Sequence, residues 1–132
     1  MASIFTRIIR GEIPCHKVAE DDRFLAFLDI APLRMGHTLV IPKVEVDRFF
    51  DLPKDVLRDI MPFAQGVAQR IGAVIPCDRV GVAVIGLEVP HAHVHLIPID
   101  GMSDMDFGRP KLSPSREELV ALSASLRAVE QP

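Results

Sequence analysis

The 132-residue sequence contains no tryptophan, no tyrosine, only two cysteines and no long apolar run. No stretch approaches the roughly 18 apolar residues that a membrane-spanning helix needs, so we expect no membrane association. The first residues lack the apolar core and the cleavage site of a signal peptide. We therefore expect Cys15 and Cys77 to be reduced thiols in a cytoplasmic protein.

A basic surface is also missing. The chain has 15 lysines and arginines against 18 aspartates and glutamates, and the basic residues form no run. This argues against duplex DNA or RNA as the main partner, and without tryptophan or tyrosine only phenylalanine offers a platform for single-strand stacking. We expect no nucleic acid polymer as partner.

The composition that remains, 48% apolar and 25% charged, is typical of a globular protein. A chain of this length buries roughly two-thirds of its unfolded surface, so it forms a core without a metal or a disulfide. We expect one domain over residues 1–132, of class α+β with about five antiparallel strands, because several strand pairs have short connections. The apolar patterns predict strands at 16–20, 23–30, 36–42, 79–85 and 91–99, and helices at 3–11, 53–75 and 114–129.

Three local features refine this prediction. Pro62 removes a backbone hydrogen bond and should kink or split the long helix. Residues 101–113 contain glycine, methionine and proline and should form an irregular surface loop. On the strand 23–30, the alternation places Leu25, Phe27 and Asp29 on one face, so Asp29 is either a solvated edge carboxylate or a binding group.

Histidine is the informative residue type. Three of the five histidines fall within residues 91–95 and alternate with apolar residues. On a strand, His91, His93 and His95 point to one face. Three histidines in register, in a chain with only five, argue against simple solvation of a sheet face.

A metal site is a second explanation, because histidine is a frequent zinc ligand. The alpha carbons of His91 and His95 lie about 13 Å apart on a straight strand, so the three rings do not converge on one ion. Two of them with a remote ligand such as His37 remain an alternative. We otherwise expect no metal and no cofactor.

Nucleophilic catalysis on phosphorus is the third explanation. A neutral imidazole nitrogen is a good nucleophile at neutral pH. The central His93 would attack, while the flanking histidines would donate hydrogen bonds to phosphate oxygens or protonate the leaving group.

At these residues the sequence resembles a known family. The pattern His-φ-His-φ-His-φ-φ, with φ apolar, is the signature of the histidine-triad (HIT) superfamily, and residues 91–97 match it. The similarity to its Hint-like branch covers about residues 3–99 and includes Gly11–Pro14 and Gly36–Lys43. Residues 100–132 form a C-terminal extension that is not diagnostic. The resemblance implies a HIT-like fold with a long helix and a C-terminal helix, and a homodimer.

The resemblance also implies an activity. Such proteins bind an AMP-like nucleotide and act at the α-phosphate of a purine nucleoside 5′-phosphoramidate or related adenylate, through a covalent nucleotidyl-histidine. His93 matches the nucleophile, and His95 matches the residue at the phosphate and leaving group. His91 matches the residue that orients the nucleophile, and His37 matches a fourth histidine behind the triad.

Further positions match nucleotide-binding residues. Asp29 matches the carboxylate that binds the ribose hydroxyls, and Glu88 falls where some relatives have serine or threonine near the leaving group. The apolar slot around the base is implied at positions that are also simply explained as core: Ile4, Phe5, Ile8, Phe27 and Ile30.

The sequence also departs from the family pattern. Ser3 and Thr6 stand where many bacterial relatives have a zinc-binding Cys-x-x-Cys, so we expect no zinc there. Leu87 stands where glutamine is frequent, and the preceding residues 82–85 are wholly apolar. These changes keep two alternatives open: a dinucleoside polyphosphate hydrolase, or a nucleotide-binding module with weak or no catalysis.

Overall fold

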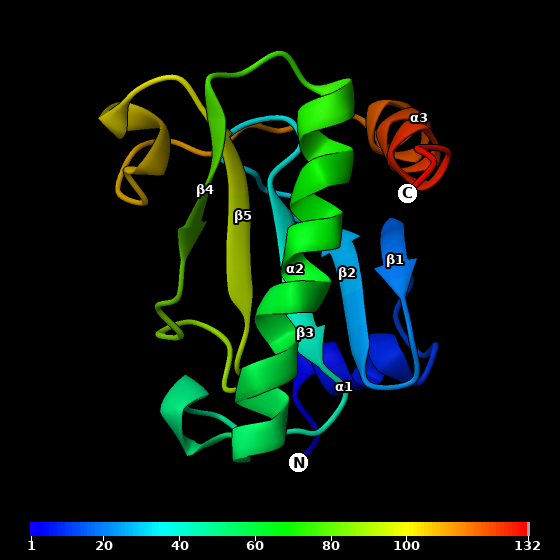
Figure 1. Cartoon of the computed structure of the whole chain (residues 1–132), viewed down its shortest axis with the longest axis vertical. Helices are drawn as coiled ribbons and strands as arrows, with labels where there is room; N and C mark the ends of the chain where they lie inside the picture. The colour runs from blue at the N-terminus through cyan, green and yellow to red at the C-terminus, as the bar shows by residue number, and fades with distance from the viewer. Residues whose placement is uncertain (132) are drawn as a thin grey trace.

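The computed structural model describes residues 1–131 and contains one five-stranded sheet (Figure 1). All neighbouring strands are antiparallel, in the order β1-β2-β3-β5-β4. This confirms the α+β class and the antiparallel sheet. The strands are β1 (Lys17–Glu20), β2 (Phe24–Leu28), β3 (Thr38–Pro42), β4 (Arg79–Ala83) and β5 (Val94–Ile99).

Three helices accompany the sheet: α1 (Ile4–Ile9), α2 (Lys54–Val74) and α3 (Arg116–Arg127), with 3-10 turns η1 (Phe49–Asp51) and η2 (Met102–Met105). Ser3 caps α1, and Gly11 follows it with a left-handed φ of +78°. Ser115 and Glu118 form the predicted capping box of α3. Within residues 1–131, no helix is long and apolar enough to cross a membrane.

The α2 helix is continuous through Pro62, so of the two outcomes predicted there, a kink or a split, the split does not occur. Proline removes only one backbone donor, and Pro62 lies on the exposed side of the helix. The buried stripe continues on both sides of it and holds the two halves on the sheet: Val56, Ile60, Ala64, Val67 and Ile71.

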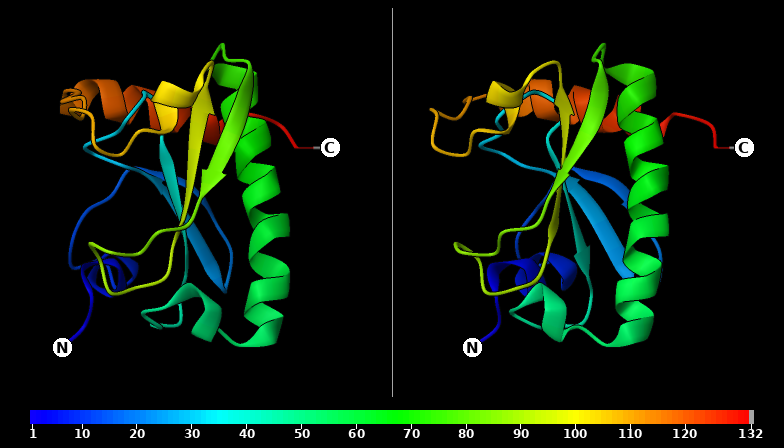
Figure 2. Two further views of the ribbon diagram at one scale, coloured as in Figure 1. Left: turned by 90° about the vertical axis from the view of Figure 1, so that its left-hand side faces the viewer. Right: turned by 60° about the vertical axis from the view of Figure 1, so that its left-hand side comes forward.

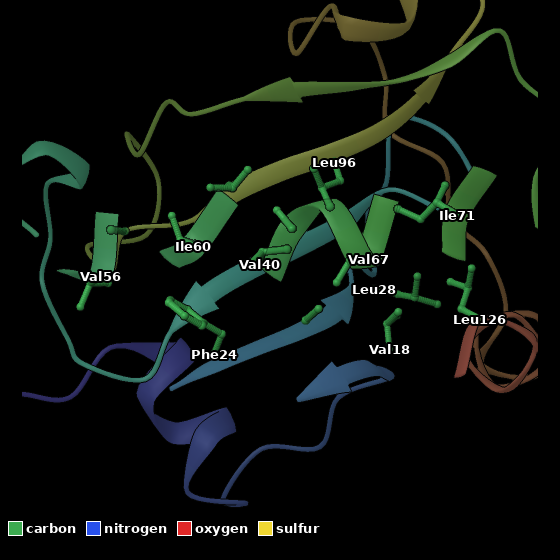
Figure 3. Close-up of a cluster of buried hydrophobic side chains, with 14 of the residues drawn as sticks. Val18, Phe24, Leu28, Val40, Val56, Ile60, Val67, Ile71, Leu96 and Leu126 are labelled. Carbon is green, nitrogen blue, oxygen red and sulfur yellow. The ribbon is translucent and has the colours of Figure 1, made fainter. Parts of the chain in front are cut away.

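The main core lies between α2 and one face of the sheet (Figure 3). Alternate residues of β2, namely Phe24, Ala26 and Leu28, face this core. Leu25 and Phe27 face the other way and join Phe5 of α1 in a smaller cluster. Figure 2 shows α1 and the segment after β5 on the side of the sheet away from α2. The period-two alternation therefore assigned the two faces of β2 correctly.

Strand β5 begins at Val94 rather than at residue 91, which corrects the predicted strand 91–99. The last pair of the ladder with β4 is Ala83 with His95, because the chain turns away from the sheet before Gly86, whose φ is +81°. His91 thus lies in a bend before the strand, and His93 in the short irregular segment that follows it. The backbone N–H of Ala92 donates to the Val46 carbonyl at 2.7 Å and keeps this segment in place.

Candidate functional site

A cavity of about 340 Å³ opens on the face of the sheet that α2 does not cover. Its lining comes from α1, the ends of β2 and β3, the loop after β4, the histidine segment and the C-terminal extension. The lining residues are Ile4, Phe5, Asp29, His37, Leu39, Ile85, Gly86, Leu87, Glu88, Val89, His93, His95, Phe107 and Lys111.

Most of the residues singled out in the sequence meet in this cavity, and four lie outside its lining. His91 is fully buried behind it. Phe27 lies behind Phe5, with ring centroids 5.5 Å apart, and Ile8 packs against the same cluster. The Ile30 side chain is 69% exposed. Of the apolar positions expected around a base, only Ile4 and Phe5 therefore line the cavity.

The His93 ring has a defined tautomer. Its Nδ1 lies 2.7 Å from the His91 carbonyl oxygen. Because a carbonyl only accepts, Nδ1 carries the proton and Nε2 keeps a lone pair. The Phe5 ring packs edge-on against the imidazole, with centroids 5.1 Å apart. Nε2 of His93 therefore has the electronic form that a nucleophile needs.

A chain of hydrogen bonds also fixes the tautomers of His37 and His95. The backbone N–H of Leu33 donates to Nδ1 of His37 at 3.1 Å, so the His37 proton stands on Nε2. That N–H donates to Nδ1 of His95 at 2.9 Å. The proton of neutral His95 is then on its own Nε2. Burial lowers the pKa of His37 to about 3 and that of His95 to about 4, so both rings are neutral at neutral pH.

Hydrogen bonds of the buried His91 ring connect the N-terminal segment to the triad. Its Nε2 donates to the Pro42 carbonyl at 2.8 Å, and its Nδ1 accepts from the Ser3 hydroxyl at 2.8 Å. The Glu45 carboxylate accepts from the Ser3 backbone N–H at 2.7 Å and from the Thr6 hydroxyl at 2.6 Å. Hydrogen bonds from Thr6 and Ser3 hold the pKa of Glu45 at about 2. Sequence reasoning missed Glu45, because nothing local marks a residue 42 positions from Ser3.

Asp29 lies at the edge of the cavity. Burial raises the pKa of its carboxyl group, although the Ala31 backbone N–H donates to Oδ1 at 2.9 Å. Ligand atoms of Asp29, His37 and His95 lie within 4.8 Å of one another. This set contains one triad histidine, not two with His37 as the sequence left open. The hydrogen bond between Nε2 of His37 and Nδ1 of His95 occupies one nitrogen of each ring.

The segment 101–113 is an irregular surface segment, as expected, apart from the 3-10 turn η2, but it also contacts the site. The Phe107 ring packs edge-on against His95 and His37, with centroid distances of 4.9 and 6.2 Å. The Lys111 ammonium donates to the Phe107 carbonyl at 2.6 Å. Both side chains line the cavity. The C-terminal extension therefore completes the site.

Contacts with the loop between β2 and β3 hold this segment in place. Arg34 pairs with Asp100 at 3.2 Å and with Asp104 at 3.0 Å. The Arg109 side chain donates to the Leu33 carbonyl at 3.0 Å, and the Leu112 N–H donates to the Pro32 carbonyl at 2.9 Å. Every partner lies more than 60 residues away in sequence, so no local pattern marks this docking.

This fold, with paired histidines on the open face of an antiparallel sheet, defines a histidine-triad protein. The HIT domain family model matches residues 10–102, so the chain belongs to the HIT family.

One relative and two solved structures are compared with this chain. The adenosine 5′-monophosphoramidase of Schizosaccharomyces pombe is 36% identical over 132 residues, which cover 96% of each chain. A Hit-like protein from Bartonella henselae has a TM-score of 0.83 and 30% identity, and covers 96% of this chain and 94% of its own. A zinc-bound histidine triad family protein from Mycobacterium smegmatis has a TM-score of 0.79 and 30% identity, with the same coverage.

Proposed function

We propose that the protein hydrolyses adenosine 5′-phosphoramidates or related adenylates at the α-phosphate, through a covalent intermediate on Nε2 of His93. The main support for this proposal is the tautomer of His93. The His91 carbonyl holds the proton on Nδ1, so the second nitrogen is unprotonated in a ring that lines the cavity. The relative in fission yeast bears the matching name, adenosine 5′-monophosphoramidase.

The reaction has two steps. Nε2 of His93 forms a bond to phosphorus while the P–N bond to the leaving amine breaks, and the amine takes the proton that it needs from water. Water then attacks phosphorus and the P–Nε2 bond breaks, which releases the 5′-nucleotide and restores the imidazole. In sum, water supplies a hydroxyl to phosphorus and a proton to the amine. His95, with its proton on Nε2, donates a hydrogen bond to the phosphate and leaving group.

The remaining cavity residues suit the nucleoside. Asp29 presents a half-buried carboxylate that accepts hydrogen bonds from the ribose hydroxyls. Ile4 and Phe5 offer an apolar surface for the base. The volume of about 340 Å³ is at the lower end of small-ligand cavities.

Intact-mass analysis after incubation with adenosine 5′-phosphoramidate tests this function. We expect wild type to release AMP, His93→Ala to be inactive and His95→Asn to accumulate a nucleotidyl adduct. His16→Ala is the matched control, because His16 lies outside the cavity lining and should keep full activity. No turnover by wild type together with no adduct on His95→Asn would refute hydrolysis, and AMP binding by calorimetry would then identify a binding module.

We also propose a homodimer that pairs through β4. This strand lies at an edge of the sheet. Val82 in the strand and Val84 and Ile85 just after it are apolar and 49%, 40% and 47% exposed. An unpaired edge with apolar side chains is suited to a two-fold pairing with a second copy. Val82→Lys should shift sedimentation equilibrium towards monomer, whereas Val120→Lys on α3 should not. A wild-type monomer at micromolar concentration would contradict the proposal.

The compartment that we propose is the cytoplasm. Cys15 and Cys77 are both free thiols. A reducing compartment maintains thiols in this state. Fractionation of cells that express a tagged chain would test it, and recovery of the chain outside the cytoplasmic fraction would contradict it.

A further inference from the structure

Lys111 is the one lysine or arginine in the lining of the 340 Å³ cavity. Its ammonium group has three donors, and the bond to the Phe107 carbonyl uses one of them. Because that acceptor is a carbonyl and not a carboxylate, the bond leaves the positive charge without a counterion in contact. The cavity therefore contains a cation that none of the proposed catalytic steps uses.

The position of Lys111 is specific within the cavity. Its Nζ lies 5.8 Å from the centroid of the Phe107 ring, and the same ring packs against His95 and His37. At the other end, Phe5 packs against His93. The Lys111 charge acts on His37 and His95, and it opposes the rise in the pKa of Asp29 that burial causes. Lys111 thus belongs to the polar end of the cavity, with these three residues, and not to the apolar end that suits the base.

The histidines at this end have little capacity to supply protons. His95 and His37 are neutral at neutral pH, since burial lowers both pKa values. Their chain of hydrogen bonds ends at the Leu33 backbone N–H, which does not release its proton. A neutral end of this kind, supplemented by one ammonium, suits a group that departs as an anion.

We propose that Lys111 determines leaving-group specificity: it stabilises an oxyanion leaving group and favours such substrates over amines. This inference rests on the proposed function and narrows its substrate class. When a carboxylate leaves, the bond from Nε2 to phosphorus forms, the P–O bond breaks and oxygen keeps the electron pair without a proton. When an amine leaves, the P–N bond breaks and nitrogen must also gain a proton.

Two substrates with the same AMP group and different leaving groups test the assignment. Adenosine 5′-phosphoramidate releases ammonia, and acetyl adenylate releases acetate, measured after subtraction of its uncatalysed hydrolysis. For Lys111→Gln we expect kcat/KM for acetyl adenylate to fall about tenfold, the size of a lost charge-assisted hydrogen bond, and that for the phosphoramidate to change by less than about twofold. Lys111→Arg should recover most of the loss.

Two further variants make the test specific. Lys54→Gln, at the start of α2, removes a lysine away from the cavity and should leave both rates unchanged. Arg48 lines an adjoining cavity of about 480 Å³ that shares His93, so it is the competing cation. If Arg48→Gln shows the selective loss and Lys111→Gln does not, the assignment is wrong. It is also wrong if Lys111→Gln lowers both rates equally or neither.

Measurements of nucleotide binding distinguish a failure of this inference from a failure of the proposed function. If wild type hydrolyses neither substrate, hydrolysis is refuted, and calorimetry with AMP and ADP still tests Lys111. We expect the β-phosphate of bound ADP to occupy the leaving-group position, so wild type should bind ADP more tightly than AMP and Lys111→Gln should lose that preference. An ADP-to-AMP preference that is equal in the two proteins would overturn the role of Lys111.

Discussion

Replacement of Ser3 by alanine removes a hydroxyl that joins two parts of the molecule. The Ser3 oxygen accepts from the Thr6 backbone N–H at 3.0 Å and so caps α1. The same hydroxyl donates to Nδ1 of His91 at 2.8 Å. Ser3 is 6% exposed and His91 is 0% exposed, so water does not replace the lost group. Thr6 lies 3.4 Å from the same nitrogen, but its hydroxyl already donates to Glu45.

The loss in the free energy of unfolding that we expect for Ser3→Ala follows from these two contacts. Loss of an N-cap costs about 1 kcal/mol, and a buried acceptor without a partner costs about 1–3 kcal/mol. The sum, about 2–4 kcal/mol, is a large share of the roughly 5–15 kcal/mol that stabilises a domain. At roughly 4 °C per kcal/mol for a chain of this size, Tm should fall by about 8–16 °C.

Differential scanning calorimetry measures this fall, and two variants separate its causes. Glycine is itself an adequate N-cap, so Ser3→Gly retains most of the cap and isolates the His91 contact at about 1–3 kcal/mol. Ser125→Ala removes an exposed hydroxyl from α3 and should change stability by less than about 0.5 kcal/mol. The reasoning is refuted if Ser3→Ala melts within about 2 °C of wild type.

Three further predictions concern pH, backbone conformation and metal. Because His37 and His95 have pKa values of about 3 and about 4, only the unfolded chain takes up their protons below about pH 6.5. The free energy of unfolding should therefore fall as pH drops from about 6.5 towards 3, by up to about 1.4 kcal/mol per pH unit for each group; equal urea stability at pH 7 and pH 5 would contradict this. Gly36 has a φ of +102°, and an added Cβ would lie 3.1 Å from Ile75, so Gly36→Ala should cost about 2–3 kcal/mol. Gly11→Ala, at φ +78° in open space, should cost about 1 kcal/mol, and equal losses would count against the steric part of the argument. Dialysis against a chelator should leave both activity and Tm unchanged, and a loss that zinc restores would show a metal requirement.

Features that depend on neighbouring residues could be predicted from the sequence. The alternation in β2 put Leu25 and Phe27 on one face, and the structure places both in the cluster with Phe5. The same alternation singled out Asp29, whose carboxylate lies at the cavity. The start of β5 could not be predicted, because it depends on pairing with β3, where Val94 meets Val40, and not on the histidine pattern itself.

Features that depend on distant contacts escaped prediction for the same reason. Glu45 binds Ser3 and Thr6 across about 40 residues, and Arg109 binds the Leu33 carbonyl across 76. Without these contacts, residues 101–113 have the composition of a loop. With them, Phe107 and Lys111 become part of the cavity.

The triad illustrates why residue type and spacing alone do not define a role. His91, His93 and His95 are chemically identical, and what distinguishes them is the group that each Nδ1 meets. A carbonyl at His93 keeps the proton on Nδ1 and leaves Nε2 as a nucleophile, whereas the His37 N–H at His95 makes Nε2 a donor. At His91 both nitrogens are occupied, one by the Ser3 hydroxyl and one by a backbone carbonyl. The proposed division into nucleophile, donor and support therefore depends on the backbone and side-chain groups around the rings, and substitutions that move these groups should change the chemistry while every histidine remains.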